Sequence, residues 1–325
     1  MKIICKPCLA LDALAAITFC NMCRNDIPQV KESIDKHFEN IKISPADAYF
    51  NWLIEKYTLG EIENFNLQDL VNKFPACIQN EALRGDFLRG LDALQAMDFA
   101  NLWQTRCLPV LEAQCKQYDQ AFADGAARAL LTDVQKLKPH EKIEDITVYL
   151  LYFTWPISFY LTPSAYQTNN PIEGEFNARW VLRLFAHELL HRFSNDDLRK
   201  LYRETAEQDD FFTKTKNVLF NDIGSPSDEE EFVVALDRFL SVNHGLFTEE
   251  EVYQNLFSHY DSCMPIAIIT FNALMKYGEI PTDINYWISQ LFYNGTIRAG
   301  EIENRVDEIL PGFSDAFKSK WFQKQ

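Results

Sequence analysis

The segment WVLRLFAHELLHRF, residues 180–193, carries the strongest structural signal in this sequence. Two histidines, His187 and His191, stand four positions apart, so on a helix their imidazoles project from one face and can converge on one metal ion. Glu188 lies between them and can act as general base on a metal-bound water. The apolar neighbours predict a buried helix, in which polar side chains need a shared partner. The segment therefore predicts a metal site rather than two separate core histidines.

With these residues, the segment resembles the zincin metallopeptidases, whose HExxH helix supplies two zinc ligands and the catalytic glutamate. The resemblance implies Zn²⁺ as cofactor, a peptide or protein as substrate, and His187, His191 and Glu188 in those roles. Zincins also run an antiparallel edge strand above the metal, and residues 157–166 are the candidate for that strand. Arg192 departs from the pattern, because these families prefer an uncharged residue after the second histidine.

A catalytic zinc site needs a third protein ligand and an open position for water. The metzincin arrangement would use Asp197, although Ser194 replaces its turn glycine and residues 194–197 resemble a helix cap and first turn. Asp210 follows His191 by nineteen residues, the spacing of aminopeptidase-type gluzincins, but those families use a glutamate there. Both aspartates stay open as alternatives.

The preferred third ligand is Glu231, in the run SDEEEFVVALD at 227–237. Ser227 as N-cap with Glu230 at the third helical position would form a capping box and occupy Glu230. Glu231 would then be free, and it is followed by Phe-x-x-Ala as in several gluzincin families. Those families often place an aspartate four residues later to orient a ligand histidine. Here Ala235 occupies that place, so the sequence identifies no such partner.

Other residues stay open as alternatives. Glu230, His244 and His259 are further candidates for the third ligand, and the site could also have no third ligand. His259 beside Tyr260, or Tyr253, could instead donate a hydrogen bond to the oxyanion of the reaction. The sequence does not rank these residues.

Composition excludes several other classes of function. The 325 residues carry 31 Lys and Arg against 47 Asp and Glu, a formal net charge of −16. Such an acidic surface repels nucleic-acid phosphates and anionic lipid, so neither is expected as a partner. The long charge-free run from Ile146 to Ile172 is interrupted by Pro156 and rich in residues typical of strands, which argues against a membrane span.

Eight cysteines are too few for a disulfide scaffold in a chain of this size, and the N-terminus does not resemble a secretory signal. Reduced thiols and a cytoplasmic location are therefore expected. The pairs Cys5–Cys8 and Cys20–Cys23 resemble a four-cysteine zinc site. A helix over residues 9–19 would separate the two pairs by about 16 Å, so buried structural cysteines are the better interpretation.

The expected fold class is α+β and predominantly helical, with a small antiparallel sheet. Residues 1–137 predict a helical N-terminal region, and the polar segment KPHEKIED at 138–145 predicts a break. Residues 138–325 would form the zincin-like catalytic region. That region contains a strand pair at 143–166 (143–154 and 157–166), the HExxH helix at 172–193, and C-terminal helices.

The expected function is zinc-dependent hydrolysis of peptide bonds, with Glu188 as general base on a zinc-activated water. The alternative is a non-catalytic protein that keeps a zincin fold as a structural or partner-binding module. Glu188 distinguishes the two, because an inactive relative has no need of that base.

Overall fold

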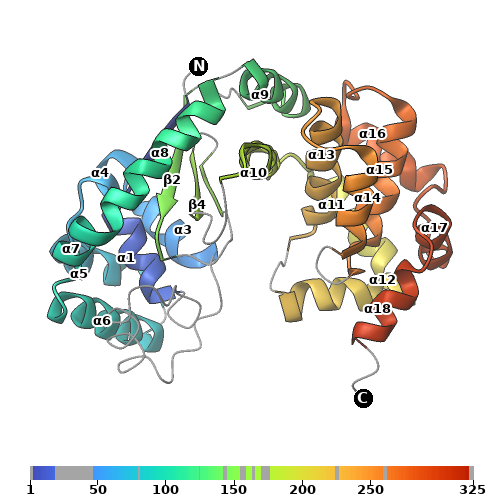
Figure 1. The fold of residues 1–325 in the computed structure, drawn as a ribbon. Helices are drawn as coiled ribbons and strands as arrows, with labels where there is room; N and C mark the ends of the chain where they lie inside the picture. Colours follow the sequence, from blue (N-terminus) through green and yellow to red (C-terminus); the bar gives the residue numbers. More distant parts are fainter. Residues whose placement is uncertain are drawn as a thin grey trace. The chain divides into compact units, whose positions relative to one another are not determined.

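In the described part of this computed structural model, most residues are helical and a small sheet accompanies the helices (Figure 1). The predominantly helical α+β class is thus confirmed. The structure describes residues 3–18, 47–79, 81–123, 125–141, 145–153, 159–162, 165–169, 176–223, 227–258 and 262–321.

The chain divides into two units, Met1–Ala123 with Ile143–Asn177, and Asp124–Lys142 with Ala178–Gln325. The predicted boundary between residues 137 and 138 falls inside the second unit. The predicted strand region joins the N-terminal helices in the first unit.

The first unit holds the sheet and the N-terminal helices. Its helical elements are α1 (Leu9–Thr18), α3 (Asp47–Lys56), α4 (Leu59–Glu63), α5 (Leu67–Lys73), η2 (Phe74–Cys77), α6 (Glu81–Ala96), α7 (Phe99–Leu102), η3 (Trp103–Cys107) and α8 (Leu108–Ala123). Helix α8 packs along β1 and β2, while α1 contacts β2 and α3 to α6.

The sheet corrects the expectation of an antiparallel strand pair. Its order is β1 (Ile3–Pro7), β2 (Ile146–Leu151), β4 (Ala165–Asn169), β3 (Phe159–Thr162). Strand β2 runs parallel to both β1 and β4, and only β3 and β4 are antiparallel. The physical reason is that the β3–β4 hairpin returns the chain beside β2 in the same direction, while β1 pairs with the other side of β2. Nearly all of β2 is buried, as is typical of an inner parallel strand.

The buried carboxylate of Asp12 joins α1 to the end of β2. It accepts hydrogen bonds from the backbone N–H groups of Tyr152 (2.8 Å) and Phe153 (2.9 Å). The indole Nε1 of Trp103 donates a third at 2.6 Å. Burial raises the pKa of Asp12 to about 6, although these hydrogen bonds act to lower it. One side chain thus satisfies three buried donors in the first unit.

We expect Asp12→Ala to lower the free energy of unfolding by about 3 kcal/mol, because each buried donor left without an acceptor costs about 1 kcal/mol or more. Urea unfolding of the full chain, followed by tryptophan fluorescence, measures this loss. Asp92→Ala on the exposed face of α6 is the matched control and should change stability by less than about 0.5 kcal/mol. Equal midpoints for the two variants would contradict the anchoring role of Asp12.

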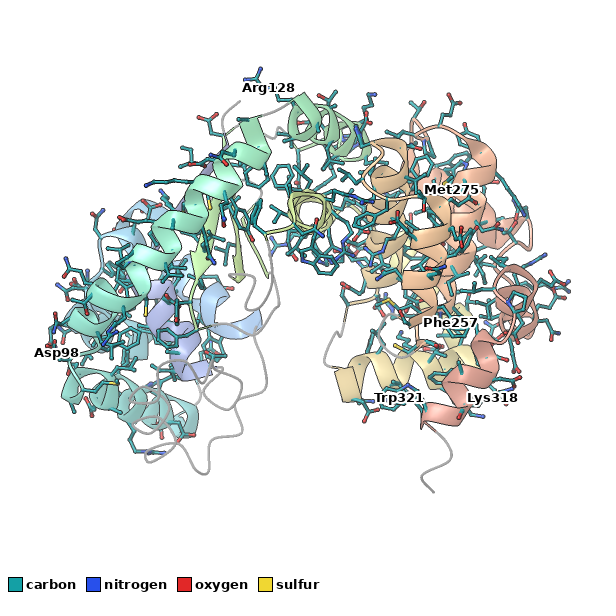
Figure 2. The ribbon with its side chains drawn as sticks, in the orientation of Figure 1. Asp98, Arg128, Phe257, Met275, Lys318 and Trp321 are labelled. Carbon is teal, nitrogen blue, oxygen red and sulfur yellow. The ribbon has the colours of Figure 1, made fainter. Side chains whose placement is uncertain are left out.

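The described part of the second unit is helical and contains the HExxH segment. Its elements are α9 (Gly125–Leu137), α10 (Ala178–Leu190), α11 (Asp196–Glu207), α12 (Asp210–Asn217), η4 (Val218–Ile223), α13 (Glu230–Asn243), α14 (Glu249–Ser258), α15 (Pro265–Tyr277), α16 (Ile284–Tyr293), α17 (Ile302–Ile309) and α18 (Phe313–Trp321). Helix α13 lies at the centre and packs against α10, α14 and α15. Figure 2 shows the side chains that fill the space between these helices.

Helix α13 is buried along almost its whole length, from Glu230 to Ser241. A helix buried on every side is normally apolar all round, yet α13 contains Glu230, Glu231, Asp237 and Arg238. Buried charges are stable only when paired or hydrogen-bonded. The partners of these side chains therefore indicate what the helix is built to hold.

The remaining expectations concern cysteines and membranes. Cys5 and Cys8 are buried free thiols, and the other four cysteines in the described part of the chain are too. Cys20 and Cys23 lie outside the described residues. Among the helices that the structure describes, none has both the length and the apolar character needed to cross a membrane.

Candidate metal centre

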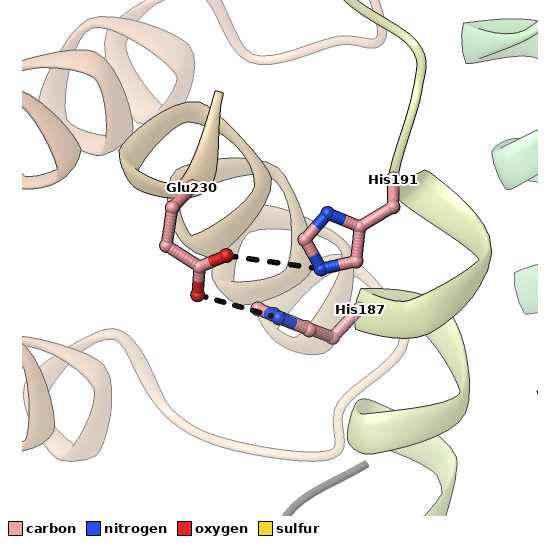
Figure 3. Close-up of side chains that lie close together, drawn as sticks. All are labelled: His187, His191 and Glu230. Atoms are coloured by element: carbon pink, nitrogen blue, oxygen red, sulfur yellow. Dashed lines mark ion pairs between the residues drawn. The ribbon is translucent and has the colours of Figure 1, made fainter. Parts of the chain in front are cut away.

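The two histidines of the HExxH segment project from one face at the end of α10. The helix is shorter than predicted and ends at Leu190, so His191 stands at the first position beyond it. The imidazole rings of His187 and His191 have centroids 5.1 Å apart and nearly perpendicular planes, at 83°. Both side chains are mostly buried, with 14% and 20% exposed. The predicted convergence of these two rings is confirmed (Figure 3).

The first turn of α13 brings a carboxylate to the same point. Oε1 of Glu230 lies 3.6 Å from Nε2 of His187, and its Oε2 lies 3.7 Å from Nε2 of His191. The donor atoms of the three residues lie within 4.8 Å of one another. Ligand atoms about 2.0–2.1 Å from a tetrahedral ion are about 3.4 Å apart, and the two distances between the Glu230 carboxylate and the imidazoles are close to this value. His187, His191 and Glu230 could therefore hold a metal ion.

Glu231, the predicted third ligand, lies elsewhere. Its carboxylate is fully buried and accepts hydrogen bonds from the Tyr202 hydroxyl (2.8 Å) and from the N–H groups of Ile266 (2.6 Å) and Ala267 (3.1 Å). It thus satisfies the N-terminus of α15. Burial raises the pKa of Glu231 to about 7, against the opposing effect of these hydrogen bonds. The structure places Glu230, not Glu231, with the two histidines.

The cause of this difference is the start of α13. The predicted capping box required the helix to begin directly after Ser227, whereas Glu229 is the N-cap and Glu230 the first helical residue. The Ser227 hydroxyl accepts a hydrogen bond from the N–H of Glu229, at 3.3 Å, and does not cap the helix. With the helix starting two residues later, the Glu230 side chain is available to face the histidines.

Two further carboxylates hold the other nitrogens of the imidazole rings. Nδ1 of His187 lies 2.7 Å from Oδ2 of Asp237, and Nδ1 of His191 lies 3.5 Å from Oε1 of Glu229. A carboxylate accepts the hydrogen on Nδ1 and so leaves the lone pair of Nε2 directed at the centre. Metal-binding histidines commonly have such a partner. Neither acid was identified from the sequence.

A signal for Asp237 was nevertheless present. It stands seven residues after Glu230, which puts the two on one face of the helix two turns apart. The four-residue spacing typical of gluzincins leads to Ala235 from Glu231 and to Val234 from Glu230, so it identifies no acid from either glutamate. Glu229 offered no comparable spacing, because its role depends on the turn that precedes α13.

Neighbouring charges shift the pKa values of the acids and of His191 in the centre. Although burial acts to raise it, Arg238 and His187 hold the pKa of Asp237 well below its usual range. Burial also acts to raise the pKa of Glu229, but hydrogen bonds from His191 and Ser194 lower it to about 2. Burial acts to lower the pKa of His191, but Glu229, Glu230 and Glu188 raise it to about 9. The centre thus strongly attracts positive charge.

Glu188 is 3% exposed and lies among these groups on α10. Burial raises the pKa of Glu188, the two histidines act to lower it, and Glu230 and Asp237 act to raise it further. A carboxylate with a raised pKa is a stronger base and is better matched to proton transfer near neutral pH. Its position and its pKa direction fit the predicted role of general base.

The structure does not bring the other described candidates to the histidines. Asp197 is exposed in the first turn of α11, whose N-cap is Asn195, as residues 194–197 predicted. Asp210 is exposed at the start of α12. Nε2 of His244 lies 2.9 Å from Asp133, and the Tyr253 hydroxyl donates to Asn272 at 3.2 Å.

Parts of two predicted features of a zincin lie outside the described residues. His259 and Tyr260 are one part, and positions 157, 158, 163 and 164 of the candidate edge strand are the other. The described residues of that candidate fall into two strands, 159–162 in β3 and 165–166 in β4. Strand β3 is an edge of the sheet, and both strands belong to the first unit, whereas α10 belongs to the second.

Comparisons with protein-family models, with curated proteins and with solved structures found no match to this chain.

Proposed function

We propose that this chain is a zinc-dependent hydrolase of peptide bonds, with His187, His191 and Glu230 as metal ligands and Glu188 as general base. One observation supports this proposal above all others. Two imidazole nitrogens and the carboxylate of Glu230 lie within 4.8 Å of one another, and the buried Glu188 stands between the two histidines in the sequence.

The donor set favours zinc. Two histidines and one glutamate leave a fourth tetrahedral position for water, as in catalytic zinc sites. Imidazole together with carboxylate suits zinc better than the hard cations calcium and magnesium, which prefer oxygen ligands alone. Zinc bound here would polarise the scissile carbonyl and lower the pKa of a water molecule to about 7.

The residues of the chain would supply proton transfer and positioning. Glu188 would accept the proton of the attacking water and deliver it to the leaving amine, which needs a base with a raised pKa. Asp237 and Glu229 would keep the imidazoles in one tautomer and orientation. We also propose that the chain has a zincin-like fold, acts on a peptide or protein substrate and is located in the cytoplasm.

The first test is the metal content of the purified protein. We expect about one equivalent of zinc per chain in protein purified without added metal, and loss of most of it in His187→Ala, because two ligands hold zinc far less tightly than three. Elemental analysis measures both. His140→Ala, outside the cluster, is the control and should retain the metal. An equally low zinc content in wild type and His187→Ala would overturn the proposal.

A further inference from the structure

A buried lysine lies against the end of the HExxH helix. Pro139 stops α9 at this point, because proline cannot continue a helix, and Lys138 follows its last residue. Nζ of Lys138 donates to the backbone carbonyl of His191 at 2.8 Å and to that of Leu189 at 3.1 Å. Its side chain is 3% exposed and also pairs with Glu141, at 2.5 Å.

These contacts meet a physical requirement of α10. The last carbonyls of a helix have no partner within the helix and carry partial negative charge, so a cation there is favourable. Packing alone would not require an ammonium group, since burying a charge is costly and an apolar side chain of similar length could fill the space. The two hydrogen bonds from Nζ to backbone carbonyls explain why a lysine occupies this position.

Glu229 binds the amide groups of the same turn. Its carboxylate accepts hydrogen bonds from the N–H of Arg192 at 2.6 Å and from the N–H and hydroxyl of Ser194. Arg192 has a φ of 65°, a left-handed conformation that non-glycine residues rarely adopt. An ammonium group on the carbonyls and a carboxylate on the amides thus fix this turn together.

We infer that Lys138 is a positioning residue for the metal ligand His191, because it fixes the backbone from which that imidazole projects. Glu229 restrains the ring through Nδ1, and Lys138 restrains the main chain through the carbonyl of the same residue. The inference rests on the proposed metal site. Lys138 lies in the predicted polar break at 138–145, outside both the HExxH segment and α13. The inference therefore adds a residue from a third segment to those that determine metal affinity.

The test compares Lys138→Met with Lys138→Arg, and with Lys136→Met as matched control. Lys136 stands two residues earlier, is exposed, and pairs with Asp133. Metal-free protein is titrated with Zn²⁺ against a chromophoric chelator to obtain Kd, and thermal unfolding of the metal-free form is recorded separately. We expect about a tenfold weaker Kd for Lys138→Met, as for other residues that support ligands. Lys138→Arg should recover most of the affinity, and Lys136→Met should match wild type.

A second readout separates positioning from general stability. In protein loaded with Co²⁺, the visible absorption bands report ligand geometry, and we expect them to shift in Lys138→Met but not in Lys136→Met. If Lys138→Met unfolds, Lys138→Gln replaces it. Its neutral amide is less costly to leave in a buried polar site than an apolar group, but it lacks the charge and is one bond too short to reach both carbonyls, so the same weakening of Kd is expected. A lower melting temperature with an unchanged Kd and unchanged bands would overturn this inference and leave the proposed function intact. Failure of the wild-type protein to bind Zn²⁺ would overturn both.

Discussion

Replacing Glu188 by glutamine is expected to lower the turnover of a peptide substrate by about 10²–10⁴-fold while leaving zinc bound. Glutamine has nearly the same shape, so it fits the buried position beside His187 and His191 without a cavity. Its neutral amide cannot accept the proton of the attacking water. Only the step that needs a base should be lost.

The measurement needs a substrate, which a peptide library can supply, and the zinc content of each variant. Glu207→Gln, at an exposed position on α11, is the matched control and should keep wild-type turnover. Undiminished hydrolysis by Glu188→Gln would remove this residue from the mechanism. A chain that binds zinc but cleaves no peptide in any form would favour the non-catalytic, partner-binding alternative.

Local spacing was sufficient to predict the first half of the candidate centre. His187 and His191 converge because residues four apart share a helix face, and this relation does not depend on the rest of the fold. The cap of the next helix at Asn195 follows from equally local chemistry. Such features can be read from a single sequence.

The third ligand could not be fixed in this way, because the start of α13 depends on tertiary contacts. Three consecutive glutamates satisfy the same local rules, and a shift of one residue turns a helical side chain by about 100°. Glu229 contacts the turn after α10, Glu230 faces the histidines, and Glu231 faces α15. Each glutamate therefore has a partner that lies far away in the sequence.

The parallel sheet could not be predicted from local sequence either. Strand β1 has five residues, includes Lys6 and Pro7, and has only Cys5 buried, so it lacks the alternation that predicts a strand. It pairs with β2 across more than a hundred residues of sequence, Ile3 opposite Ile146. Parallel pairing is always non-local, because the chain must cross over between the strands.

The adjacent residues Glu230 and Glu231 are expected to differ in function, Glu230 in metal binding and Glu231 in stability. Glu230→Ala should weaken zinc binding by more than the roughly 10–100-fold that loss of a supporting residue causes, because a ligand itself is removed. The metal-free protein should remain folded. Glu230 lies in the first turn of α13, where a negative charge contributes only about 0.3–1 kcal/mol.

Glu231→Ala should have the opposite effect. It removes the acceptor for the Tyr202 hydroxyl and for the N–H groups of Ile266 and Ala267, all of them buried. Three such losses should lower the free energy of unfolding by about 3 kcal/mol or more. The ligands of the proposed site are untouched, so the folded fraction should bind zinc with nearly wild-type affinity.

Zinc titration and urea unfolding of the metal-free proteins, carried out side by side, separate the two effects. Asp197→Ala is the control for both measurements, since this exposed side chain lies outside the cluster. Loss of zinc in Asp197→Ala alone would indicate a metzincin-like site. Loss in Glu231→Ala at unchanged stability, with zinc retained in Glu230→Ala, would mean that α13 begins at a different residue in solution. Because the same substitution is made at adjacent positions, a general loss of negative charge cannot explain opposite outcomes.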